Sequence, residues 1–138
     1  MKPPLAGIKI ADFSRVLAGP YATMLLADLG AQVVKVERPE VGDDTRTWGP
    51  PFDKDGNATY FLSVNRNKEG LELDLTDQAD QVRAVELINS SDVVVENFGP
   101  GGMEKYNLGY SKLIGNNPKL INRINNQILL TLLNEQHC

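Results

Sequence analysis

Glu37 and Arg38 stand directly after a run of valines, at the place where a buried strand should end. In dinucleotide-binding folds an acid at this place accepts the ribose 2′-OH, while a nearby Arg accommodates a ribose phosphate. Arg38 therefore favours a nucleotide that carries an extra ribose phosphate. The alternative is a solvated charge pair at the end of a strand, which is the commoner use of any single Arg.

Two turns have the composition of ligand-binding turns. Residues 97–102, NFGPGG, follow the strand pattern DVVVE, and ligands of open α/β sheets bind at the carboxyl ends of strands. Three glycines there would let the backbone approach a phosphate closely. Residues 14–20 hold one glycine, Gly19, where dinucleotide folds carry G-x-G-x-x-G. An ordinary NAD site is therefore disfavoured, and a tight turn and a ligand-free helix start remain the alternatives.

A cationic turn at residues 65–68, NRNK, could contribute to a polyanion site. Arg66 and Lys68 of this turn could surround such a ligand, although a cation cluster is more often solvated surface. The other cations of this predicted cluster are Arg15, Arg38 and Lys105. The only His and the only Cys are adjacent, at positions 137 and 138, so neither a metal site nor a catalytic Cys–His pair is expected.

A strand–helix–strand unit over residues 7–38 should position these groups. Ile8 and Ile10 begin a short apolar run, Pro20 suits the first turn of a helix, and Gly30 suits its end. The valines then form a β-branched strand. Such a βαβ unit makes the two strands parallel and the crossover right-handed. The predicted fold class is α/β, a Rossmann-like parallel sheet with flanking helices.

Further elements follow along the chain. Leu71, Leu73 and Leu75 alternate with acids and predict a strand with one buried face. Thr76 should cap a helix that runs to about Asn89. Four of its residues are expected to face the sheet: Val82, Val85, Leu87 and Ile88. Another strand should begin at Leu120 and Ile121 and be cut off there, which leaves the sheet incomplete at the C-terminus.

Composition narrows the function classes. The chain has 138 residues, 41% of them hydrophobic, and a net charge of −4. This charge argues against nucleic acid as a partner, since phosphate contacts need clustered Lys and Arg. No apolar stretch approaches 18 residues, so no membrane partner is expected. A single Cys allows no internal disulfide, and the first residues do not resemble a signal peptide, so a cytoplasmic location is expected.

Seven motifs together are more specific than any one of them. They are RVLAGP at residues 15–20, LADLGAQVVKVERP at 26–39, GDDTRTWGPPF at 42–52, NRNK at 65–68, DVVVENFGPG at 92–101, LGY at 108–110 and NPKLI at 117–121. In this combination the chain resembles the N-terminal part of the family III CoA-transferases, the CaiB/BaiF family. The loop at 42–52 with YFLSVNRNK at 60–68 is most similar to the succinate–hydroxymethylglutarate CoA-transferase branch, which includes mitochondrial members, so a mitochondrial location is the alternative.

The resemblance implies that residues 1–121 are the N-terminal part of a Rossmann-like domain that binds coenzyme A as a substrate. An acyl-CoA and a small, dicarboxylic acid would be the partners, and two full-length chains would form a homodimer. Arg38 would meet the nucleotide end, residues 73–76 the adenine side, and residues 97–99 the pantetheine or diphosphate region. By motif position the CoA contacts are Leu17, Ala18, Arg38, Leu73, Asp74, Leu75, Thr76, Asn97, Phe98, Gly99 and Lys105.

The family's chemistry uses an Asp nucleophile, which attacks the acyl-CoA thioester and forms a mixed anhydride. The resemblance ends before this Asp, and no Asp follows Asp92, so no catalytic residue is assigned. Residues 122–138 are interpreted as a divergent tail, either a helix or unselected sequence. The favoured interpretation is an N-terminal piece of a CoA-transferase that is inactive and marginally stable by itself. The alternatives are a non-catalytic module that binds CoA or another nucleotide and, disfavoured by the missing glycines, an NAD-dependent oxidoreductase fragment.

Overall fold

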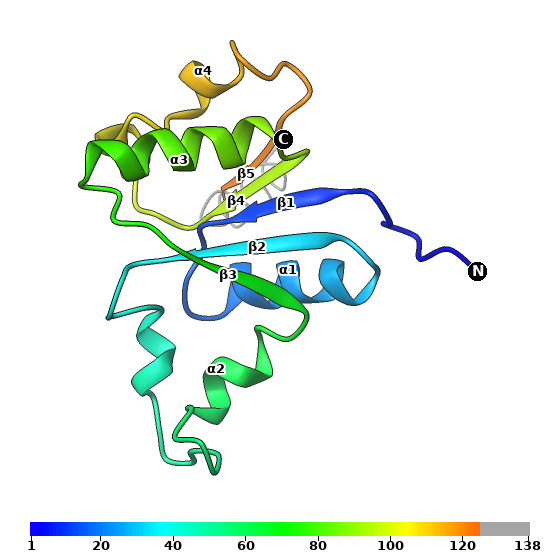
Figure 1. Ribbon diagram of the computed structural model, residues 1–138, viewed down its shortest axis with the longest axis vertical. Coiled ribbons are helices and arrows are strands. Elements are labelled where there is room, and N and C mark those ends of the chain that lie inside the picture. Colours follow the sequence, from blue (N-terminus) through cyan, green and yellow to red (C-terminus); the bar gives the residue numbers. More distant parts are fainter. Residues whose placement is uncertain (125–138) are drawn as a thin grey trace, which may run out of the picture.

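The computed structural model describes residues 1–124, in which five strands form one parallel sheet with the order β3-β2-β1-β4-β5 (Figure 1). The elements in chain order are β1 (Lys9–Asp12), α1 (Ala18–Asp28), β2 (Gln32–Glu37), η1 (Asp44–Thr47), α2 (Thr59–Ser63), β3 (Lys68–Glu72), α3 (Gln78–Asn89), β4 (Val93–Glu96), η2 (Glu104–Tyr106), α4 (Tyr110–Leu113) and β5 (Ile121–Ile124). The predicted α/β class with a parallel sheet and flanking helices is confirmed.

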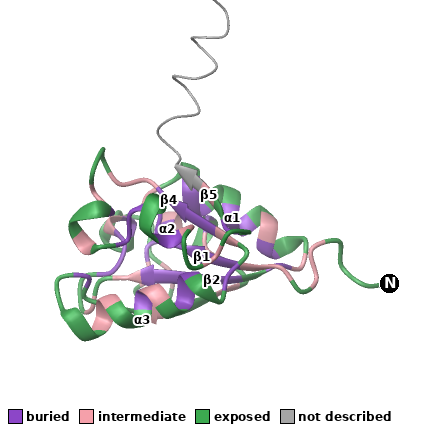
Figure 2. Ribbon diagram, turned by 90° about the horizontal axis from the view of Figure 1, so that it is seen from above, coloured by how far each residue is buried: buried purple, intermediate pink, exposed green. Residues whose placement is uncertain are grey.

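Both faces of the sheet are buried. Consecutive strand residues point to opposite sides, so each face presents its own set of side chains. On one face Ile10, Val33 and Val95 pack with Ala27 of α1. On the other face the strands pack against α3, through Ala11, Val34, Val36, Val94, Ala84, Leu87 and Ile88. Figure 2 shows α1 and α3 on opposite sides of the sheet. This double burial explains why β2 and β4 are nearly continuous runs of valine.

The strand order reverses at β1, which lies between β2 and β4. The chain therefore leaves the carboxyl ends of the adjacent strands β1 and β4 in opposite directions, toward β2 and β5, and ligands of doubly wound sheets bind at such a point. The predicted helix end is also confirmed. Gly30 follows α1 with φ +99°, and an added Cβ would overlap the Cβ of Pro3, so two separate constraints require glycine there.

The strand predicted from the leucine alternation is wrong in its position. β3 spans Lys68–Glu72, so it starts at the last residue of the turn predicted at residues 65–68 and ends before Leu73 and Leu75. Both leucines are buried, as the alternation predicted, but they lie beyond the strand. β3 is an edge strand whose position is set by pairing with β2, which places Lys68 opposite Val33. Side-chain alternation alone does not reveal where that pairing begins.

The start of α3 differs from the prediction by one residue. Asp77, not Thr76, caps the helix, because its side chain accepts hydrogen bonds from the N–H groups of Ala79 and Asp80. Thr76 instead donates through its own N–H and hydroxyl to Asp74. The predicted end at Asn89 is confirmed.

Val82 does not face the sheet, because it lies about 200° around the helix from Ala84. It is 55% exposed, and Ala84 occupies the buried position instead. The other three predicted residues do pack toward the core, Leu87 and Ile88 buried and Val85 partly buried.

The strand expected to begin at Leu120 and Ile121 is present as β5, which begins at Ile121 and pairs in parallel with β4. It continues to residue 124, into the segment that we assigned to the tail, while residues 125–138 lie outside the described part of the chain. The domain boundary at residue 121 stays a prediction. Among residues 1–124, no helix is long and apolar enough to cross a bilayer.

Candidate functional site

A pocket of about 220 Å³ opens beyond the carboxyl ends of β1, β2, β3 and β4. Its apolar lining combines two aromatic rings that follow β1 and β4 with aliphatic side chains beside β2 and β3; these residues are Phe13, Phe98, Val36, Leu73 and Leu75. Two cations, Arg15 and Arg38, also line it. The pocket thus combines a surface for a flat apolar group with guanidinium groups that can bind an anion.

The structure gathers six of the eleven predicted CoA contacts in this pocket: Arg38, Leu73, Asp74, Leu75, Thr76 and Phe98. The other five do not line it. Leu17 and Ala18 are exposed at the start of α1, and Gly99 and Lys105 are exposed beyond β4. The fifth, Asn97, contacts the turn between β1 and α1.

Asn97 joins the end of β4 to this turn through two hydrogen bonds. Its Oδ1 accepts from the N–H of Arg15 at 2.9 Å, and its Nδ2 donates to the carbonyl of Arg15 at 2.7 Å. The next residue, Val16, has φ +70°, and its N–H donates to both carboxylate oxygens of Asp43 at 3.3 Å. Contacts from two sides therefore hold a backbone conformation that costs a non-glycine residue energy.

Two glycines of the turn after β4 have a structural reason, because Gly101 has φ +72° and Gly102 has no room for a side chain. An added Cβ at Gly102 would lie 2.6 Å from the Cβ of Phe98 and 2.8 Å from the carbonyl oxygen of Gly99. At Gly99 no atom lies within 4 Å of an added Cβ. The tight-turn alternative therefore explains Gly101 and Gly102, while Gly99 has open space around it.

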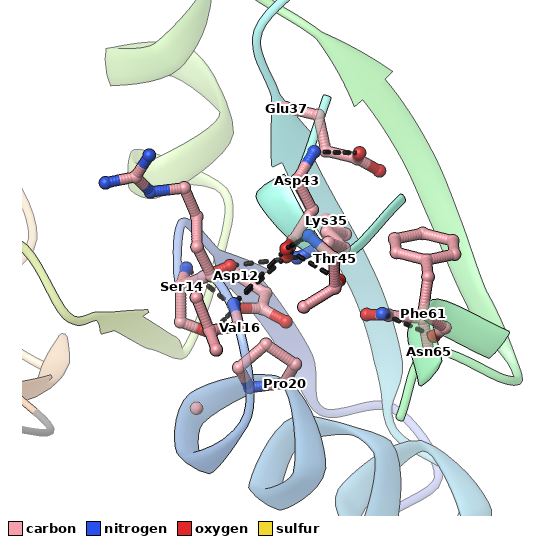
Figure 3. A network of polar contacts seen from close by, with 12 residues as sticks. Asp12, Ser14, Val16, Pro20, Lys35, Glu37, Asp43, Thr45, Phe61 and Asn65 are labelled. Carbon is pink, nitrogen blue, oxygen red and sulfur yellow. Dashed lines mark hydrogen bonds and ion pairs between the residues drawn. The ribbon is translucent and has the colours of Figure 1, made fainter. Parts of the chain in front are cut away.

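A buried ion pair lies between β2 and the loop that follows it (Figure 3). Lys35 Nζ donates to Asp43 Oδ2 at 2.9 Å and to the carbonyl of Ser14 at 2.8 Å. Asp43 Oδ1 accepts from the N–H of Thr45 at 3.0 Å and from its hydroxyl at 2.8 Å. Burial by itself raises the pKa of Asp43, but the hydrogen bond and charge of Lys35, together with the hydrogen bonds from Thr45, outweigh this and leave the pKa below its ordinary value.

A second buried ion pair joins β3 to β1. Lys68 Nζ lies 3.1 Å from Asp12 Oδ2, and it donates to the carbonyl of Pro20 at 2.8 Å and to Asn65 Oδ1 at 2.9 Å. Only 2% of the Lys68 side chain is exposed, and this burial lowers its pKa although the charge of Asp12 opposes the shift. Asp12 also accepts from Thr23 of α1, so the pair connects three elements.

The cation cluster predicted around a ligand is wrong for the turn at residues 65–68. Lys68 is buried beside Asp12, and Arg66 donates to Asp28 of α1, with 3.1 Å between Nε and Oδ1. Of the five cations considered, Arg15 and Arg38 line the pocket. Charge and position in the sequence alone did not distinguish the cations that pair with acids of the fold from the cations that line the pocket.

Glu37 lines the pocket, but both of its carboxylate oxygens are hydrogen-bonded. Arg46 donates to them at 2.6 and 2.9 Å, and the N–H of Asp43 donates to Oε2 at 2.9 Å. Burial raises the pKa of Glu37, but these hydrogen bonds outweigh it and lower the pKa overall. Arg46 in turn lies over the ring of Phe61, 3.8 Å from its centroid.

Sequence reasoning missed Lys35 and Asp43, although the sequence carried a signal for them. The run VVKVE places a lysine inside a strand that is otherwise valine and buried, and a buried lysine requires a counter-charge. Among residues 1–124, no three His, Cys, Asp or Glu side chains form a group that could hold a metal ion. The pocket offers binding groups, and the carboxylates of Glu37, Asp43 and Asp74 that line it all accept hydrogen bonds from the protein.

Comparison with known proteins gives consistent matches. The model of CoA-transferase family III matches residues 5–123. The succinate–glutarate CoA-transferase of Agrobacterium fabrum is 49% identical over 125 residues, which cover 87% of this chain and 31% of that protein. The succinyl-CoA:glutarate CoA-transferase of Homo sapiens is 54% identical over 110 residues, 80% of this chain and 25% of that protein. A CaiB/BaiF family protein from Brucella suis has a crystal structure that superposes with a TM-score of 0.84 at 46% identity, over 88% of this chain and 33% of that one. The chain therefore spans about a quarter to a third of the length of these relatives.

Proposed function

The chain belongs to CoA-transferase family III, and from this premise we propose that it binds coenzyme A in the pocket beyond β1 to β4. The reaction would transfer CoA between an acyl-CoA and a dicarboxylic acid. Two relatives are named for succinate or succinyl-CoA and for glutarate, which supports a dicarboxylic acceptor. A homodimer of the whole protein is part of the same proposal.

The observation that carries the proposal is the place of Arg38 at the end of β2, beside an apolar pocket. In Rossmann-like sheets this is where an Arg meets a ribose phosphate. Sites for whole drug-sized ligands have volumes of about 300–1,000 Å³. The smaller pocket seen here suits one end of CoA, and the position of Arg38 supports the adenosine 3′-phosphate end as its occupant. The five predicted contacts outside the pocket would then meet the rest of the CoA chain.

The groups that line the pocket support the binding of CoA and do not supply the covalent chemistry of the transfer. The family's nucleophile is an Asp, and the carboxylates that line this pocket are held by other groups of the chain. No Asp follows Asp92 in the sequence. We therefore propose that these 138 residues supply part of the CoA site and that the transfer chemistry requires residues outside them. A non-catalytic CoA-binding module is the second candidate, and the same pocket supports it.

The test is calorimetric titration of the chain with CoA and with 3′-dephospho-CoA. The chain should bind CoA saturably, and Arg38→Gln should weaken that binding about tenfold, since hydrogen bonds to charged groups contribute about 1.5–3 kcal/mol. Both proteins should bind 3′-dephospho-CoA equally. Arg83→Gln is the matched control, because Arg83 is an exposed cation of α3 that pairs with Asp80 away from the pocket.

Equal binding of CoA by the chain and Arg38→Gln would refute the assignment of Arg38. Transfer of CoA from succinyl-CoA to glutarate, followed by chromatography, should be undetectable with the chain alone. Turnover by the chain alone would refute the division between binding and chemistry.

A further inference from the structure

Asp44 lies between the two arginines of the pocket. Its Oδ2 is 3.2 Å from Nη1 of Arg15, and its Oδ1 is 3.8 Å from Nη2 of Arg38. Arg15 comes from the turn after β1, Arg38 follows β2, and Asp44 begins η1. One carboxylate therefore brings together two guanidinium groups from separate segments of the chain.

This carboxylate differs from the buried acids beside it. Asp43 and Glu37 are held by several donors each, and Asp43 supplies the cap of η1. The side chain of Asp44 is 40% exposed, and those of Arg15 and Arg38 are 42% and 56% exposed. Ion pairs at such exposure contribute little to folding stability, so an anion from solution can replace the carboxylate at small cost.

Arg15 is also held in place by neighbours. The side-chain amide of Asn97 fixes both its N–H and its carbonyl, and its guanidinium lies 6.0 Å from the centroid of the Phe98 ring. Phe98 lines the same pocket. An Arg with a fixed backbone and an aromatic neighbour is preorganised to bind a planar or tetrahedral anion.

We propose that Arg15 and Arg38 form one phosphate site, and that Asp44 occupies its anion position until a ligand phosphate replaces it. This rests on the proposed function for the identity of the ligand, and it adds Arg15 as a phosphate contact and Asp44 as an internal competitor. A phosphate dianion carries more charge and more acceptor oxygens than a carboxylate, so it displaces Asp44. The site thereby stays closed to weaker anions.

The test compares the chain with Asp44→Asn by calorimetry, with CoA and with inorganic pyrophosphate as separate probes. Removal of the competitor should tighten binding of both probes about three- to fivefold, the range expected for an exposed ion pair of about 0.7–1 kcal/mol. Asp55→Asn removes the same charge at an exposed position outside the pocket and should change binding by less than twofold. In an Arg15→Gln, Arg38→Gln background, Asp44→Asn should have no effect.

Each outcome decides between the two proposals. If Asp44→Asn binds CoA equally well or more weakly, the proposal that Asp44 competes with the ligand phosphate is refuted, while the proposed CoA function is not. Pyrophosphate binding that tightens in Asp44→Asn, with no binding of CoA by any variant, supports the phosphate site and overturns the CoA function. No binding of either probe overturns both. Asp44→Ala serves as a second variant, and near-ultraviolet circular dichroism confirms that each protein is folded.

Discussion

Glu96 is a buried acid whose charge opposes folding. It lies at the end of β4, 5% exposed, and its carboxylate accepts a hydrogen bond from the N–H of Phe98 at 2.7 Å. Burial raises its pKa above the ordinary 4.5, the Phe98 bond opposes the shift, and the nearby charge of Glu104 adds to it. A raised pKa means that the folded chain binds this proton more tightly than the unfolded chain does. Stability is therefore lost as the pH rises from 4.5 through the folded pKa.

We expect Glu96→Gln to stabilise the chain at pH 7, because the raised pKa means that the buried charge of Glu96 opposes folding there. Gln keeps an acceptor for Phe98 and carries no charge. Urea unfolding at pH 4 to 7 measures the effect, and the difference between the two proteins should shrink toward pH 4. Glu86→Gln, at an exposed position of α3, is the control. A variant that is less stable than the native chain at pH 7 would show that the charge of Glu96 supports the fold.

At the scale of elements, Asp43 connects three segments that must meet for the pocket to form. It accepts hydrogen bonds from Lys35 of β2, from Thr45 of η1 and from Val16 in the turn before α1. The two cations of the pocket adjoin these segments in the sequence, since Arg15 precedes Val16 and Arg38 directly follows β2. A change at Asp43 therefore acts on the site through the three segments that it holds together.

Asp43→Asn should destabilise the chain by about 3–5 kcal/mol, because it leaves the charge of Lys35 buried without a counter-charge. Denaturant unfolding followed by circular dichroism measures the loss. Asp77→Asn is the matched control, because Asn caps a helix as well as Asp does and should change stability little. Adding Lys35→Met to Asp43→Asn should restore part of the stability. A loss below 1 kcal/mol for Asp43→Asn would mean that water reaches Lys35.

These elements also show what the sequence can and cannot predict. The βαβ unit was predictable because Pro20, Gly30 and the valine run each act locally. The cap of α3 was not, because Thr76 and Asp77 are both good caps and the choice depends on Asp74, which binds Thr76. The pocket was predictable where it follows strand ends, as at Arg38. The burial of Lys68 was not, because its partner Asp12 is 56 residues away.

At the scale of the whole molecule, α1 presents an apolar outer face. Leu17, Tyr21, Leu25 and Leu29 are spaced four residues apart, each between 41% and 49% exposed. The outer face of a surface helix is ordinarily polar, and contiguous exposed apolar patches mark surfaces that become covered. Because the chain spans about a quarter to a third of its relatives, we expect this face to be covered in the longer protein.

The 138-residue chain should therefore self-associate in a concentration-dependent way. Leu25→Glu places a charge in the middle of the α1 face and should shift the population toward monomer by sedimentation velocity. Val82→Glu is the control, because Val82 is as exposed but lies on α3, beside the charged Arg83. Equal association of both variants would exclude the α1 face as the cause. A cooperative melt of a soluble monomer at high temperature would contradict the expected marginal stability.

The ion pair of Lys68 has a consequence for how the sheet finds its alignment. β3 is an edge strand, and edge strands slip in register more readily than central ones. Lys68 reaches past β2 to Asp12 on β1, so a slip by one residue would turn its ammonium to the opposite face and leave Asp12 unpaired. Only one alignment of β3 therefore neutralises both charges. The pair therefore specifies the register of β3, and it can form only when β1 lies beside β2.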